Sequence, residues 1–196
     1  TGVAQGIRYI EDFKLQNFEK NPVVVCSLGD NSVTEGEVAE AFQFAALHQL
    51  PIIFLGQDNE WGISVTKEEA RTSDAYDYAA GFVGLNRMRI DGTDFVESFI
   101  QMQKAVHFVR EERKPPLVCA KTVLIGHHTS GVRREFYRDK ADLAKHSAKD
   151  PGIILKKYLL DEGFNEETLS HIEIEARKQI EEDFNKAILA PDPKPE

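Results

Sequence analysis

The sequence has 196 residues, of which 41% are hydrophobic and 29% charged, as in an ordinary globular protein with one main domain. The formal net charge of −9 argues against a general nucleic-acid binder, because such proteins present a basic surface to phosphate groups. No apolar stretch is long enough to span a bilayer, and we expect no signal peptide. We therefore expect no membrane partner, and a location in the cytoplasm or, in a eukaryote, in the mitochondrial matrix.

The first residues combine a helical pattern with a buried strand. Residues 3–14 place apolar side chains at helical spacing, and residues 23–28 form a short β-branched run that is typical of a central parallel strand. Because the chain starts at Thr1 inside the expected helix, we expect an upstream segment that belongs to the same domain.

The next segment predicts a helix followed by a second strand. Thr34 and Glu37 have the spacing of a capping box, in which two side chains satisfy free N–H groups at a helix start. The helix that follows has an alanine-rich apolar face, and residues 52–55 form a second short apolar run. A polar loop, residues 56–64, comes after that strand.

The alternation of strands and helices continues along the chain. We expect helices at residues 74–83 and 95–110, and strands at residues 87–90 and 117–123. Such alternation predicts an α/β fold with a mostly parallel sheet and helices on both faces.

The last third departs from this alternation. Residues 124–141 are polar with weak periodicity, and a loop of this length is usually functional or mobile. Helices are expected at residues 151–160 and 166–189, and the chain ends in a proline-rich tail that resembles a linker. We therefore divide the chain into an α/β domain, residues 1–150, and a C-terminal helical extension with its tail, residues 151–196.

Polar loops follow the first two expected strands. Gly29-Asp30-Asn31 follows the first strand and Asp58-Asn59-Glu60 the second, with one helical crossover between them. Because parallel strands end at the same edge of a sheet, both loops reach one site if the strands are neighbours. Carboxylate and amide oxygens suit Mg²⁺, and a glycine before a helix lets the backbone approach an anion. Taken singly, each loop is also consistent with turn and helix-cap chemistry.

A series of short motifs extends this pattern over most of the chain. In order they are Thr34-Glu35-Gly36, Phe44-Ala45-Ala46, Leu50-Pro51, Trp61-Gly62-Ile63-Ser64, Asp91-Gly92-Thr93-Asp94, Gly126-His127-His128-Thr129-Ser130 and Tyr137-Arg138. The stretch LGDNSVTEGEVAEAFQFAALHQLPIIFLGQDNEWGIS resembles the thiamine-diphosphate motif, which starts with Gly-Asp-Gly and ends in Asn-Asn. The whole series resembles the alpha subunit of the branched-chain and pyruvate-type 2-oxo acid dehydrogenases, either as a fragment or as the alpha part of a fused alpha–beta chain.

The resemblance implies thiamine diphosphate and Mg²⁺ as cofactors, and a role for each matching residue. It implies that the metal is held by the side chains of Asp30 and Asn59 and the carbonyl oxygen of Trp61, and that the cofactor is contacted by Gly29, Asn31, Ser32, Ile63 and His128. His128 would also assist proton transfer as the catalytic residue, a task that suits an imidazole at neutral pH. From the residues alone, the pattern favours His128 as one solvated histidine of an adjacent pair.

The resemblance also implies an activity and partners. The implied activity is the oxidative decarboxylation of a 2-oxo acid, with transfer of the acyl group to a lipoyl-bearing acyltransferase. A beta subunit or beta-like domain would supply the other half of the cofactor site. The paired histidines lean slightly toward a branched-chain substrate such as 2-oxoisovalerate rather than pyruvate.

Other functions remain open at this point. A transketolase-like or acetoin-dehydrogenase-like enzyme shares the cofactor motif but uses another acceptor, and a homologue with an impaired motif would be a scaffold. A simple nucleotide-binding protein is disfavoured, because no Gly-X-Gly-X-X-Gly follows residues 23–28.

Two positions depart from the usual motif. Asn31 stands where a glycine is common, and Asp58 where an asparagine is common. Asparagine tolerates a positive φ better than most residues, so we expect the turn at Asn31 to survive. Asp58 adds negative charge near a diphosphate, which weakens binding unless a metal ion or an arginine offsets it. Three arginines of the later loop, Arg133, Arg134 and Arg138, either order that loop or form a solvated basic turn.

Overall fold

The structure is a computed structural model that describes residues 1–193, and its centre is a parallel sheet. Four strands, all paired in parallel, lie in the order β1-β2-β6-β5. Their bounds are Val24–Gly29 for β1, Ile52–Asp58 for β2, Asn86–Asp91 for β5 and Pro116–Lys121 for β6. An antiparallel hairpin of β3 (Trp61–Gly62) and β4 (Val65–Thr66) directly follows β2.

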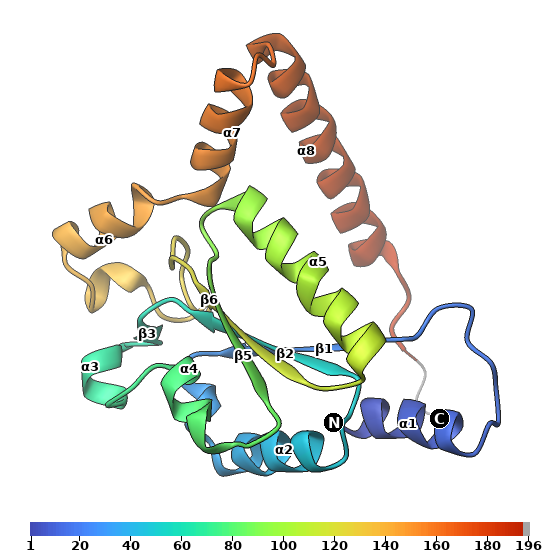
Figure 1. Ribbon diagram of the computed structural model, residues 1–196. Helices are drawn as coiled ribbons and strands as arrows, with labels where there is room; N and C mark the ends of the chain where they lie inside the picture. The colour runs from blue at the N-terminus through green and yellow to red at the C-terminus, as the bar shows by residue number, and fades with distance from the viewer. Residues whose placement is uncertain (194–196) are drawn as a thin grey trace. The chain divides into compact units, whose positions relative to one another are not determined.

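Helices cover both faces of this sheet. The α-helices are α1 (Gly2–Asp12), α2 (Gly36–Leu47), α3 (Lys67–Ala70), α4 (Ala75–Tyr78), α5 (Phe95–Glu112), α6 (Lys140–Ser147), α7 (Pro151–Asp161) and α8 (Glu166–Leu189), and the short 3-10 turns are Ser32–Thr34, Ala79–Gly81 and Arg134–Phe136. Figure 1 shows α2 and α4 on one face of the sheet and α5 on the opposite face. The predicted α/β class, with a mostly parallel sheet between helices, is confirmed.

Alternation along β2 divides the core into two layers. Successive strand residues point to opposite faces, so Ile52 and Phe54 pack with α2 and α4, while Ile53 packs under α5. Phe42 of α2 meets Phe54 edge-on, with ring centroids 4.8 Å apart. Fully burying one such side chain stabilises the fold by about 1.5–3 kcal/mol. This packing fixes β2 at the centre of the sheet and thereby places the loop that follows it.

Three local predictions need correction. The capping box expected at Thr34 and Glu37 is wrong: Thr34 donates its hydroxyl to the carbonyl of Asn31 at 3.2 Å, and α2 begins at Gly36 without a side-chain cap. The structure has a capping box at Thr66 and Glu69 instead.

The other two corrections concern element lengths. β2 continues to Asp58, because its last residues pair with β6, so the expected loop after residue 55 is a strand end and a hairpin. The helix expected at residues 74–83 is a single turn of α4 followed by a 3-10 turn.

The chain divides into two compact units, Thr1–Pro151 and Gly152–Glu196. In the second unit, the Asn165 side chain caps α8 by accepting the Thr168 N–H at 2.7 Å, and Leu169 is buried. The part of the expected tail at residues 194–196 lies outside the described residues.

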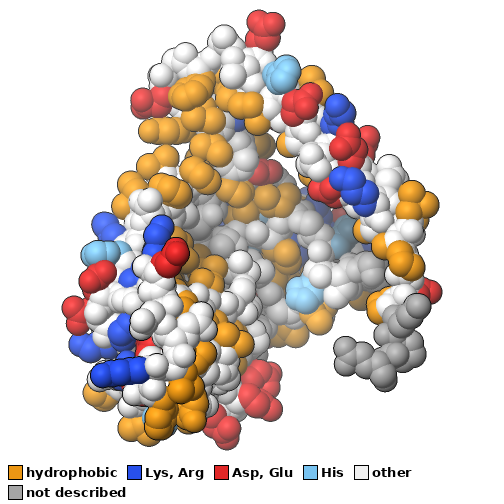
Figure 2. Space-filling model, turned by 90° about the vertical axis from the view of Figure 1, so that its right-hand side faces the viewer, with side chains coloured by type: hydrophobic (Ala, Val, Ile, Leu, Met, Phe, Trp, Pro, Cys, Tyr) orange, Lys and Arg blue, Asp and Glu red, His pale blue; other side chains and the backbone are white. Residues whose placement is uncertain are grey.

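Figure 2 shows hydrophobic side chains at the surface among acidic and basic ones. Within residues 1–193, none of the helices combines the length and the apolar character that crossing a bilayer requires.

Candidate functional site

The carboxyl ends of the four parallel strands place charged residues side by side. β1 and β2 are neighbours, with Gly29 opposite Gln57, and Asp58 of β2 lies opposite Lys121 of β6. The Asp30 N–H donates to the Gln57 carbonyl at 3.2 Å, which continues the pairing past the end of β1. Asp30 therefore follows the strand adjacent to the one that leads into Asn59, which meets the condition for a shared site.

One arginine joins the two loops. Arg71, the residue that ends α3, places Nη1 2.7 Å from Asp30 Oδ2 and donates from Nη2 to Asp58 Oδ1 at 2.8 Å. Its Nη1 also donates to the side-chain oxygen of Asn31 at 2.9 Å. The side chains of Arg71 and Asp30 are only 6% and 3% exposed, so this is a buried charge cluster. Removing one partner of a buried ion pair typically costs about 3–5 kcal/mol, which makes Arg71 central to the geometry of both loops.

Asp30 has the properties of a ligand for a hard cation. Burial raises the pKa of its carboxyl group, the Arg71 guanidinium opposes that rise, and the nearby Asp58 carboxylate adds to it. Asp30 Oδ2 is paired with Arg71, whose Nη1 lies 2.7 Å away. A buried carboxylate at the end of a strand also suits Mg²⁺, which prefers oxygen ligands. The donor set therefore fits the metal that the sequence predicts.

The second loop is bent around Trp61 and Gly62. The side-chain oxygen of Asn59 accepts the Trp61 N–H at 2.9 Å. Two residues beside this segment adopt a left-handed backbone, Glu60 with φ 69° and Ile63 with φ 61°. A positive φ at a β-branched residue is a true outlier, and such strain is concentrated at functional sites. Among residues 1–193, no group of three His, Cys, Asp or Glu side chains forms a metal cluster, so a metal here would depend on Asn59, a carbonyl oxygen and the cofactor itself.

The side chain of Asn31 fits into space that the absence of a side chain at Gly62 leaves open. The Asn31 backbone has φ −75° and ψ −29°, so the turn forms without the positive φ that asparagine tolerates. Its side chain lies against Gly62, where an added Cβ would come within 1.7 Å of Asn31 Nδ2. The glycine of the second loop therefore makes room for the asparagine of the first. Beside it, Ser32 donates its hydroxyl to the Gly29 carbonyl at 2.8 Å.

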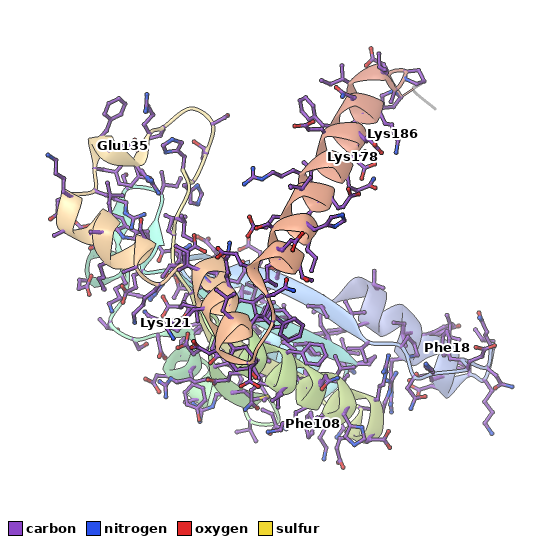
Figure 3. All side chains as sticks on the ribbon, turned by 90° about the horizontal axis from the view of Figure 1, so that it is seen from above. Phe18, Phe108, Lys121, Glu135, Lys178 and Lys186 are labelled. Carbon is purple, nitrogen blue, oxygen red and sulfur yellow. The ribbon has the colours of Figure 1, made fainter. Side chains whose placement is uncertain are left out.

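Glu60 forms ion pairs with three lysines, next to the residues that could bind a metal ion. Lys67, Lys121 and Lys145 lie 2.7, 2.8 and 2.9 Å from its carboxylate. Burial alone would raise the pKa of Glu60, but hydrogen bonds from the three lysines hold it well below its ordinary value. Lys121, labelled in Figure 3, also lies 3.3 Å from Asp58 and so links this cluster to the Arg71 cluster.

The Tyr137-Arg138 motif packs on Trp61. The Trp61 and Tyr137 rings are 5.7 Å apart, and the Arg138 guanidinium lies 5.2 Å from the Trp61 ring centroid. Arg138 donates to the Leu124 carbonyl at 2.7 Å, while His146 Nδ1 accepts the Leu124 N–H at 3.0 Å. The start of the long loop is thus clamped from both sides of Leu124.

Residues 126–133 of that loop are exposed. His128 is exposed and, within the described chain, forms no hydrogen bond or ion pair with the residues at the ends of β1 and β2. Its neighbour His127 accepts the Arg134 N–H at 3.3 Å. Of the three loop arginines, Arg138 orders the loop, whereas Arg133 and Arg134 pair with Glu135, which Figure 3 labels.

The predicted site residues fall into two groups. Seven of them lie at the end of β1 or in the segments that directly follow β1 and β2: Gly29, Asp30, Asn31, Ser32, Asn59, Trp61 and Ile63. His128 lies in the later loop, after β6. Sequence reasoning missed Arg71 and Glu60. A need for a cation near Asp58 was the only signal that pointed toward Arg71.

The fold and the site define an α/β domain with carboxylate and amide side chains at the carboxyl edge of a parallel sheet, where such sheets bind ligands. Residues 3–196 match the family model described as Dehydrogenase E1 component, and the chain belongs to this family. The family resemblance inferred from the motifs is thereby confirmed.

Similar curated proteins are alpha subunits of two kinds. The chain is 31% identical over 180 residues to the 3-methyl-2-oxobutanoate dehydrogenase subunit alpha of Mycobacterium tuberculosis (strain CDC 1551 / Oshkosh), covering 90% of this chain and 48% of that protein. It is 30% identical over 184 residues to the pyruvate dehydrogenase E1 component subunit alpha of Rickettsia conorii, covering 92% and 54%. It is 30% identical over 177 residues to the mitochondrial 2-oxoisovalerate dehydrogenase subunit alpha of Homo sapiens, covering 89% and 40%. The chain thus spans about half the length of the curated relatives it matches.

Proposed function

We propose that this chain forms the metal- and diphosphate-binding part of the alpha half of a 2-oxo acid dehydrogenase. The observation that carries the proposal is the buried Asp30 carboxylate at the end of β1, on the strand next to the one that leads into Asn59. Family membership supports the choice of thiamine diphosphate as the ligand of this edge.

Each predicted residue has a distinct task in this proposal. Asp30, Asn59 and the Trp61 carbonyl would hold Mg²⁺, which neutralises the diphosphate. Gly29, Asn31, Ser32 and Ile63 would line the cofactor through backbone and short side-chain contacts. Thiamine diphosphate, when bound, supplies the carbanion chemistry that removes CO₂ from a 2-oxo acid. His128 would hold or deliver a proton during transfer of the acyl group to a lipoyl acceptor.

The partners follow from the same reasoning. A beta subunit or beta-like domain would complete the cofactor site, and a lipoyl-bearing acyltransferase would take the acyl group. A branched-chain 2-oxo acid is our preferred substrate, and relatives named for both branched-chain and pyruvate enzymes support the broader class. The expected cytoplasmic or mitochondrial-matrix location stays a prediction.

The test uses the natural protein that contains this chain, together with its beta-type partner. CO₂ release is measured for a branched-chain 2-oxo acid and for pyruvate, with and without thiamine diphosphate and Mg²⁺, and acylation of an isolated lipoyl domain is measured in parallel. We expect CO₂ release that requires both cofactors, faster with the branched-chain acid, and an acylated lipoyl domain.

The outcomes separate this function from its alternatives. Cofactor-dependent cleavage of a ketose or of acetoin, without CO₂ release from any 2-oxo acid, would favour the transketolase-like or acetoin-cleaving class. No cofactor-dependent reaction with any of these substrates would favour a scaffold.

A further inference from the structure

Arg71 contacts three oxygens of the candidate site although it belongs to none of the sequence motifs. These oxygens are Asp30 Oδ2, Asn31 Oδ1 and Asp58 Oδ1, at 2.7, 2.9 and 2.8 Å from the guanidinium. Two of the three contacts go to the two residues that depart from the usual motif. The arginine and both departures therefore form one interacting set.

The contact with Asp30 opposes a divalent ion at the same carboxylate. A guanidinium 2.7 Å from Asp30 Oδ2 and a metal ion bound to this carboxylate would be two cations within a few ångströms of each other. Their repulsion is weakly screened, because Asp30 and Arg71 are both more than nine-tenths buried.

The fold provides space into which the guanidinium can retreat. A cavity of about 520 Å³ borders Arg71 and is lined on its other sides by Asp58, Asp74 and Arg89. Arg71 can leave Asp30 and keep its bond to Asp58, which lies at the same cavity. Asp74 offers a second carboxylate along the cavity wall.

We propose that Arg71 and the divalent ion compete for the Asp30 carboxylate, so that Arg71 sets the Mg²⁺ concentration that the site requires. The inference rests on the proposed function, since it assigns a regulator to the same site. Arg71 is here a positioning residue: it holds the loops together through Asn31 and Asp58, and it yields Asp30 to the metal. Asp58, which would otherwise repel the diphosphate, becomes the anchor that keeps the arginine nearby.

The test measures thiamine diphosphate binding by the natural protein, with its beta-type partner, across a series of Mg²⁺ concentrations. Wild type is compared with Arg71→Gln, with the charge-conserving Arg71→Lys, and with Lys121→Gln. Lys121 is the matched control, because it lies 3.3 Å from Asp58 but is not within ion-pair distance of Asp30. Its removal therefore takes away a similar charge without freeing the Asp30 carboxylate.

We expect Arg71→Gln to lower the half-saturating Mg²⁺ concentration by about tenfold, or about 1.4 kcal/mol, because the metal no longer has to displace a cation from Asp30. The half-saturating Mg²⁺ concentration of Arg71→Lys should lie between those of wild type and Arg71→Gln. Lys121→Gln should change that concentration by less than about twofold, as for an exposed ion pair. An unchanged or higher requirement in Arg71→Gln, with normal binding in wild type, would overturn the competition but leave the proposed function intact. No binding in wild type or any variant would overturn both.

Thermal unfolding provides a second readout. Arg71→Gln should lower the unfolding midpoint in EDTA, and the gap to wild type should narrow when Mg²⁺ and thiamine diphosphate are added. A gap that stays constant would mean that Arg71 is only structural, and a gap that widens would mean that it binds the diphosphate directly. If Arg71→Gln fails to fold, Arg71→Lys gives the same comparison with the charge retained.

Discussion

The two parts of the candidate site differ in how firmly the chain itself holds them. The loops after β1 and β2 are tied together by the buried Arg71 cluster and by the fit of Asn31 against Gly62. The loop that carries His128 is clamped at Leu124 but exposed beyond it. On the proposed function, the difference predicts that metal and diphosphate binding depend on contacts within this chain. The described residues, by contrast, give His128 no hydrogen bond or ion pair.

The largest expected effect is on the stability of the protein, through the Arg71 cluster that joins the loops after β1 and β2. Arg71→Leu should lower the free energy of unfolding by about 3–5 kcal/mol, because it leaves the buried Asp30 without its cation and leaves Asp58 with Lys121 alone. Arg89→Leu is the matched control, since Arg89 also pairs with two aspartates, Asp74 and Asp77, but at an exposed position. The midpoint of urea unfolding measures both, and an equal loss in the two variants would contradict a special role for the buried cluster.

The next effect concerns the exposed loop. His128→Ala should slow acylation of a lipoyl domain by about 100-fold, the lower end of what one general acid–base group contributes. Thiamine diphosphate binding should stay within about threefold of wild type, because the loops after β1 and β2 are unchanged. His127→Ala serves as the control on the adjacent residue. A larger loss in His127→Ala than in His128→Ala would contradict the assignment and give the proton-transfer role to His127.

A smaller effect tests the contact between the two strand-end loops. Gly62→Ala should destabilise the protein by about 1–3 kcal/mol, because its methyl group overlaps the Asn31 side chain. Asn31→Gly in the same protein should recover most of that loss, which a double-mutant cycle in urea measures. Purely additive losses would show that the two residues do not interact.

The smallest effect is a dependence of stability on pH. The folded state holds the pKa of Glu60 below its ordinary value of 4.5, so its contribution is present above that pH and is lost as the pH falls below it. Wild type should therefore be more stable than Glu60→Gln at pH 7, and the difference in unfolding midpoint should shrink on acidification below pH 4.5. A difference that does not vary with pH would mean that the three lysines do not act through charge.

Sequence reasoning reached the strands and the strand-end residues for clear physical reasons. Short β-branched runs identified β1 and β2, and the parallel arrangement then placed Asp30 and Asn59 on neighbouring strands. It missed Arg71, because this residue follows a four-residue helix without a periodic pattern, and its partners are about 13–41 positions away.

The capping box at Thr34 failed because of a local competing bond, in which its hydroxyl donates to the Asn31 carbonyl. The contacts of Asn31 with Arg71 and Gly62 could not be predicted, because they join segments far apart in the sequence and no local pattern encodes them.

The most direct test of the proposed metal site is a calorimetric titration of thiamine diphosphate into the natural protein, with its beta-type partner, in the presence and absence of Mg²⁺. Asp30→Asn is compared with Asp91→Asn, a carboxylate at the same edge of the sheet that is bonded to Thr93 rather than to Arg71. We predict Mg²⁺-dependent binding in wild type and Asp91→Asn, and no measurable binding in Asp30→Asn. Binding by Asp30→Asn with wild-type affinity and Mg²⁺ dependence would contradict the assignment of the metal to the end of β1.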